Sequence, residues 1–141
     1  MFSDVLRAKY ATIYYVTGEG INVFGHLLIK IGEHYFHVDP THNYPLYMND
    51  GEFKSYMKHY KRTIISTQKI VITDSLALHS RLTELMRKEF RFNLMDNNCF
   101  IFISRVIGKG MIAPPPATTS PLAHLGNLVD NILIALGWGM R

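Results

Sequence analysis

The lone cysteine of the chain, Cys99, directly follows Asp96–Asn98, three residues that favour the N-cap of a helix. This placement predicts Cys99 in the first turn of a helix. Unpaired backbone N–H groups and the positive end of the helix dipole favour the thiolate over the thiol there. A cysteine with the ordinary pKa of about 8.5 is mostly protonated at neutral pH, so this position suits a nucleophile. The alternative is a small buried apolar residue beside Phe100 and Ile101.

His26 is the candidate general base for that thiol. Its segment predicts a strand, and a two-residue turn at Gly32-Glu33 leads into a second strand. The resulting register places Asp39 directly opposite His26 and places His37 diagonal to it on the same face. A polar neighbour of this kind holds a histidine in one tautomer, as a general base requires. The alternative is a histidine at the rim of the sheet, paired with a carboxylate for solubility.

The first half of the chain predicts the sheet that would carry these residues. Short segments rich in β-branched and aromatic residues end at glycine or proline turns, as strands do. Thr41–Tyr60 is mixed, and Asn49–Gly51 within it has the composition of a turn. The expected strands are Tyr10–Val16, Phe24–Ile31, His34–Asp39 and, as one or two strands, Arg62–Ile72.

The second half predicts helices. From Asp74 onward the apolar residues Leu78, Leu82, Leu85 and Met86 recur at helical spacing, and Thr73 or Asp74 can cap this helix. A second helix is expected from the Asp96–Asn98 cluster to about Ile107, before Gly108. A sheet followed by helices predicts an α+β fold.

A proline-rich segment, Ala113–Pro121, separates these elements from a final amphipathic helix at Leu122–Leu136. The expected organisation is therefore a domain at 1–112, a linker at 113–121 and a C-terminal helical segment at 122–141. We expect the last helix to pack on its own domain, because it is too short to span a bilayer. The alternative is contact with a protein partner or a membrane surface.

The composition is that of one compact domain. The 141 residues are 48% hydrophobic and 18% charged, which excludes a disordered or low-complexity chain. One cysteine excludes an intramolecular disulfide and a multi-cysteine zinc finger. Met1–Lys9 is charged and about 18 consecutive apolar residues occur nowhere, so we expect no signal peptide and no membrane span. The compartment stays open, with the cytoplasm as the default expectation.

A metal site and a nucleic-acid site are two alternatives to the cysteine site. Zinc could be held by histidines and a thiolate, but His34, His37, His42 and Cys99 match no compact ligand spacing, so we expect no metal and no cofactor. The net charge of +4 is too mild to imply nucleic acid. A basic and aromatic segment at 53–62 could bind phosphates or another anionic surface or substrate, but a solvated face is the commoner arrangement. Nucleic acid is therefore an unlikely partner.

Two segments resemble the motifs of a known enzyme group. Gly25–Pro40 (GHLLIKIGEHYFHVDP) resembles the first motif of circularly permuted papain-like cysteine hydrolases, which lecithin:retinol acyltransferase-type and NlpC-related proteins share. Phe92–Phe102 (FNLMDNNCFIF) is similar to their second motif, an Asn-Cys at a helix start, and to a segment of the PPPDE-type deubiquitinating and deSUMOylating peptidases. The histidine precedes the cysteine, which is the order that permutation of the papain layout produces.

The resemblance implies a function for the domain at 1–112. Cys99 would be the nucleophile, His26 the base and His37 the orienting third member, with Asp39 competing for that third role. The implied activity is hydrolysis of an amide, isopeptide or ester bond through an acyl-enzyme, in a peptide, isopeptide, cell-wall or lipid acyl substrate. The alternatives are an acyltransferase or lipid-ester hydrolase of the same fold, and a non-catalytic binding module.

Overall fold

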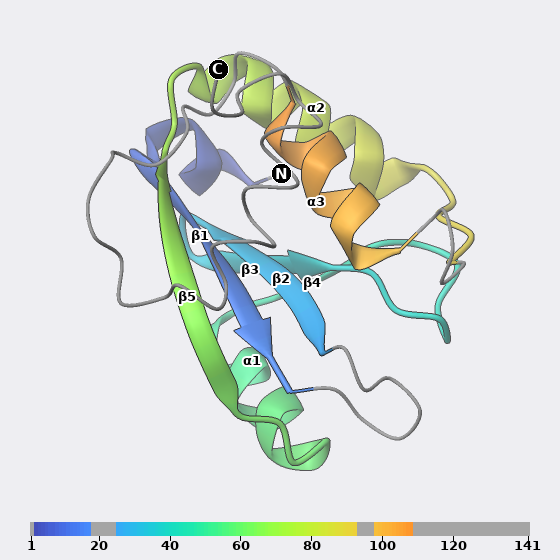
Figure 1. The fold of residues 1–141 in the computed structure, drawn as a ribbon. Coiled ribbons are helices and arrows are strands. Elements are labelled where there is room, and N and C mark those ends of the chain that lie inside the picture. The colour runs from blue at the N-terminus through green and yellow to red at the C-terminus, as the bar shows by residue number, and fades with distance from the viewer. Residues whose placement is uncertain (1, 18–24, 93–97, 109–141) are drawn as a thin grey trace, which may run out of the picture.

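The computed structural model describes residues 2–17, 25–92 and 98–108 (Figure 1). This part of the chain has an α+β fold, as predicted, with a five-stranded antiparallel sheet in the order β4-β3-β2-β1-β5. Within it, no helix has the length and apolar character needed to cross a membrane. The predicted linker and C-terminal helix lie outside the described residues, as does most of the Asp96–Asn98 cluster.

The elements predicted within the described residues are present in the predicted order, and β4 and α1 lie between them where the sequence predicted only turns. The strand predicted at Tyr10–Val16 has the predicted bounds, and the segment at Arg62–Ile72 forms one strand rather than two. The helix predicted from Asp74 is present, and the Asp74 side chain caps it by accepting the backbone N–H of Ala77. The elements are a 3₁₀ helix at Ser3–Arg7, β1 at Tyr10–Val16, β2 at His26–Ile31, β3 at His34–His37, β4 at Leu46–Met48, α1 at Asp50–His59, β5 at Ile64–Val71, α2 at Ser75–Arg87 and α3 at Cys99–Ile107.

Helix α1 corrects the prediction of a turn at Asn49–Gly51. The Asn49 side chain accepts the backbone N–H of Glu52 at 2.8 Å, and the Glu52 carboxylate accepts the backbone N–H of Asn49 at 3.0 Å. This reciprocal pair is a capping box, which satisfies two N–H groups at the start of a helix. The turn prediction was wrong because asparagine and aspartate favour helix starts as strongly as they favour turns.

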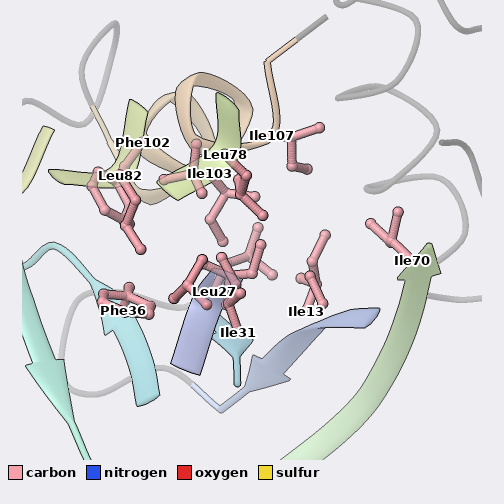
Figure 2. Close-up of a cluster of buried hydrophobic side chains, with 14 of the residues drawn as sticks. Ile13, Leu27, Ile31, Phe36, Ile70, Leu78, Leu82, Phe102, Ile103 and Ile107 are labelled. Carbon is pink, nitrogen blue, oxygen red and sulfur yellow. The ribbon is translucent and has the colours of Figure 1, made fainter. Parts of the chain in front are cut away.

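Helices cover both faces of the sheet. Successive side chains of β2 point to opposite faces, so this strand contributes to a hydrophobic core on each face. Leu27, Ile29 and Ile31 of β2 belong to the larger core, formed with α2 and α3. Figure 2 shows Leu78 and Leu82 of α2 and Phe102 and Ile103 of α3 above the strands. Leu28 belongs instead to a smaller cluster with Phe53 of α1 on the opposite face. Full burial of each such side chain stabilises the fold by about 1.5–3 kcal/mol, so both faces of β2 are fixed by packing.

Candidate functional site

Strands β2 and β3 pair in the register that a two-residue turn predicts. Lys30 lies opposite Tyr35, and Ile31 lies opposite His34. Strand β3 ends at His37, however, so the expected pairing of His26 with Asp39 is wrong. The Asp39 carboxylate instead accepts the Thr41 backbone N–H at 2.8 Å, which turns the chain away from the sheet after the strand.

His26 and His37 form a buried pair of imidazoles at this end of the sheet. His26 Nε2 lies 3.1 Å from His37 Nδ1, and the two residues are 4% and 1% exposed. The rings meet edge to face, with centroids 5.3 Å apart. The His37 ring also lies 5.2 Å from the ring of Tyr56 in α1, which places the pair on the α1 face of the sheet.

Both imidazoles of the pair are neutral at pH 7. Burial, together with the nearby His37 and the Arg62 charge, lowers the pKa of His26 to about 3, against a smaller opposing effect of Asp39. Burial likewise lowers the pKa of His37 to about 4, opposed mainly by the Asp39 charge. Because each ring carries a single N–H, one ring donates the hydrogen bond and the other accepts it.

Gly25 sets the backbone that leads into His26. It adopts φ +85°, a left-handed conformation that favours glycine. A side chain added there would collide with a ring carbon of Tyr15 and would lie 2.7 Å from the backbone carbonyl oxygen of Val16. The close approach of β1 therefore requires glycine immediately before the histidine.

Cys99 is the first residue of α3, and Asn98 is the N-cap. The Asn98 side chain accepts the backbone N–H of Ile101 at 3.2 Å. Burial raises the pKa of the Cys99 thiol, and hydrogen bonds from the backbone of Leu27, Phe100 and Cys99 itself oppose the rise. The expectation that the thiolate is the favoured form is therefore wrong for the described structure, because burial outweighs the helix terminus.

Helix α3 places Cys99 beside β2. The helix packs on β2, and Cys99 contacts the larger core, to which Leu27 also belongs. The imidazole pair lies on the α1 face of the sheet, where the His37 ring meets Tyr56. The backbone of Leu27 acts on the pKa of the thiol, so the thiol lies close to the residue that follows His26. Among the described residues, no hydrogen bond joins the sulfur to either imidazole.

Arg62 is the site residue that sequence reasoning missed. Its charge lowers the pKa of His26, His37 and Cys99, so it acts on all three groups. The guanidinium donates to the Thr17 carbonyl at 2.6 Å and lies 5.5 Å from the centroid of the Tyr56 ring. Its position in a basic and aromatic segment predicted a solvated face. The contact that turns it toward the site spans 45 residues and leaves no local signal.

His34 and His42, the other histidines considered as zinc ligands, are each paired with a carboxylate. His34 Nδ1 lies 3.0 Å from the Asp4 carboxylate, and His42 Nδ1 lies 2.9 Å from that of Asp39. In residues 2–17, 25–92 and 98–108, no three histidine, cysteine, aspartate or glutamate side chains gather as a metal site would require.

The buried imidazole pair should make the fold sensitive to acid. Well above pH 6.5 both rings are neutral in the folded and in the unfolded chain, and they contribute no pH dependence. As the pH falls below 6.5 the unfolded chain binds protons that His26 and His37 do not bind until about pH 3–4. We expect the free energy of unfolding to be about 4 kcal/mol lower at pH 5 than at pH 7, measured by urea denaturation.

Two variants control this measurement. Exposed His59→Gln should keep the full pH dependence, whereas His37→Gln should remove about half of it. Equal stability of the unmodified chain at pH 7 and pH 5 would contradict the burial of two neutral imidazoles.

The described site thus combines a thiol at a helix start, a hydrogen-bonded pair of neutral imidazoles and one arginine whose charge acts on all three. Burial keeps the thiol protonated and the two imidazoles neutral. Comparison of this chain with protein-family models, with curated proteins and with solved structures gave no match.

Proposed function

We propose that the protein is a cysteine hydrolase of the permuted papain-like type, with Cys99 at the start of α3 as its nucleophile. The observation that carries this proposal is that Cys99 begins α3, which packs on β2, the strand that His26 begins. His37, which is hydrogen-bonded to His26, supplies the third group of the arrangement. A nucleophile, a base and a group that orients the base are the parts that covalent acyl transfer needs.

The hydrogen bond between the imidazoles determines which nitrogen can act as the base. When His26 Nε2–H donates to His37 Nδ1, the lone pair of His26 stands on Nδ1. That nitrogen can then take the proton of the Cys99 thiol. In this tautomer His37 is a positioning residue, because it acts on the thiol only through His26.

The reaction begins from a neutral thiol and a neutral imidazole. His26 removes the thiol proton as the Cys99 sulfur attacks the carbonyl carbon of the substrate, and the S–C bond forms. The bond to the leaving group then breaks, and the proton passes from His26 to the departing amine or alcohol. Water, deprotonated by His26, hydrolyses the thioester and releases the acid and the free thiol.

The charged residues around the site act at different steps of this reaction. The Asp39 charge raises the pKa of His26, so it stabilises the imidazolium that forms during attack. Arg62 has the opposite effect on the imidazolium but lowers the pKa of Cys99 and favours developing negative charge on sulfur. The backbone N–H of Cys99, at the start of α3, can donate to the oxyanion of the tetrahedral intermediate.

One observation favours a second function, that of a non-catalytic binding module. Burial raises the pKa of the Cys99 thiol, as it does for cysteines that serve only in packing. Acyl transfer to an acceptor other than water would use the same acyl-enzyme, so trapping that intermediate separates both catalytic functions from the binding module.

The test is to trap the acyl-enzyme. The full chain, mixed with p-nitrophenyl acetate and quenched in acid, should gain one acetyl group by intact-mass spectrometry, and peptide mapping should place it on Cys99. We expect the acid limb of acylation to lie well below pH 6.5, because the pKa of His26 is lowered to about 3 and the base is still neutral at pH 5.5. Acetylation only at lysines, with an unmodified Cys99, would favour the binding module.

A further inference from the structure

An open groove of about 860 Å³ lies on the α1 face of the molecule. Its floor is apolar and includes Tyr14 of β1, Phe53 and Met57 of α1, and Ile64 at the start of β5. The volume is at the upper end of the range for ligand pockets, and the groove is open rather than enclosed. An apolar floor in an open groove suits a chain that lies along the surface better than a small molecule held in a closed cavity.

The same groove carries four cationic side chains. Lys54 and Lys58 come from α1, and Lys61 and Arg62 follow the helix. Among the described residues, neither Lys58 nor Lys61 forms an ion pair. Together, these four residues form the cationic rim of the groove.

The acidic residues of α1 lie at one end of the cationic rim. The Asp50 carboxylate accepts a hydrogen bond from the Tyr35 hydroxyl at 2.7 Å, pairs with Lys30 at 3.4 Å and also interacts with the charge of Lys54. The Glu52 carboxylate belongs to the capping box with Asn49. Both carboxylates are thus at the first turn of α1, away from Lys58 and Lys61 at its other end.

Lys61 holds its place on the rim at a conformational cost. Its φ of +52° is left-handed, at the position after a helix where glycine is favoured. The two hydrogen bonds of a Schellman motif hold it there, from Lys61 N–H to Lys58 and from Arg62 N–H to Met57 at 2.8 Å. A lysine in a conformation that favours glycine is consistent with a role for its charge.

The spacing of the rim identifies the ligand chemistry. Lys54 and Lys58 are one helical turn apart, so their attachment points repeat every ~6 Å along α1. Side chains on one face of an extended peptide repeat every ~6.6 Å, and the intervening side chains face the other way. Carboxylates at alternate positions can therefore meet successive lysines, while the intervening apolar side chains meet the groove floor. We propose that this groove binds an extended acidic peptide segment in which acidic and apolar residues alternate.

Arg62 connects the groove with the cysteine site. It lines the groove, and its charge acts on Cys99 and on the imidazole pair. If the bound peptide is the substrate, its acidic segment lies on one side of the bond that Cys99 attacks. This last step rests on the proposed hydrolase function, whereas binding in the groove does not.

Binding is tested with the full chain and a fluorescein-labelled decapeptide in which glutamate alternates with valine and alanine. Fluorescence anisotropy should show saturable binding that weakens as salt rises, because exposed charges are screened. The same peptide with glutamine for glutamate should bind at least about 5-fold more weakly. Equal binding of the two peptides would overturn the proposal, and so would displacement of the acidic peptide by millimolar inorganic phosphate or by anionic phospholipid vesicles alone.

Charge reversal on the rim gives the sharper result. Lys54 and Lys58 are exposed, so Lys54→Glu with Lys58→Glu should fold and should prefer a lysine peptide over the glutamate peptide. Arg81→Glu with Arg87→Glu on α2 changes the net charge equally and should leave the preference for glutamate unchanged. An equal loss of binding in both double variants would mean that net charge, not the groove, attracts the peptide.

Lys61→Gly separates stability from binding at one position. Glycine removes the backbone strain of the left-handed conformation, so the melting temperature should rise. Loss of the lysine charge should weaken peptide binding about 2- to 5-fold. Unchanged peptide affinity would remove Lys61 from the rim. Cys99→Ala should bind the peptide normally. In the unmodified chain, an unacylated Cys99 together with intact peptide binding would refute the hydrolase and leave the groove standing.

Discussion

Cys99→Ala is expected to abolish hydrolysis while leaving the fold intact. The Cys99 sulfur is the only group at the site that can form the thioester, so kcat/KM should fall by about 10⁴-fold or more. Helix α3 should survive, because its N-cap hydrogen bond comes from the Asn98 side chain and not from the thiol. Initial rates of ester and peptide hydrolysis, together with thermal melts, measure both expectations.

Two further variants make this result specific to the thiol. Cys99→Ser keeps a hydroxyl at the same place and should be almost as inactive, because a neutral imidazole activates an alcohol less readily than a thiol. Ser104→Ala lies in the same helix, removes a hydrogen bond to the Ile101 carbonyl at 2.8 Å and should stay active. Substantial turnover by Cys99→Ala would remove Cys99 from the mechanism.

The protonation state of Cys99 shows why sequence alone could not describe the site. The sequence contains the signals for a helix start, and α3 does begin at Cys99 behind the Asn98 cap. It does not contain the burial of the thiol against the core that α3 shares with β2. Desolvation is a property of the assembled fold, and here it has the larger effect on the pKa of the thiol.

The fold itself was more predictable than the site. Alternation in β1 and β2 and the helical spacing of Leu78 and Leu82 are local patterns, and the structure has these elements. Helix α1 was missed because the residues that cap it also form turns. Arg62 was missed because its contacts with Thr17 and with the charges of the site link distant segments.

The second large effect is expected at His26. His26→Ala removes the proposed base and should lower kcat/KM by about 10²–10⁴-fold. His37→Ala should lower it less, since His26 would still carry a lone pair but would lose its partner at 3.1 Å. The strand register alone favoured Asp39 as the third group, but that carboxylate accepts hydrogen bonds from Thr41 instead. Asp39→Ala should therefore cost only a few-fold, through the charge that it contributes.

If His37 positions His26, its substitutions should differ in a way that simple damage to the fold would not produce. His37→Gln can still accept a hydrogen bond from His26, so it should recover part of the activity lost in His37→Ala. His37 lowers the pKa of His26, and its removal should shift the acid limb of the kcat/KM profile to higher pH. A crippled Asp39→Ala beside a near-normal His37→Ala would instead assign the third role to Asp39. In that case the carboxylate would have to leave Thr41 and reach His26 when substrate binds.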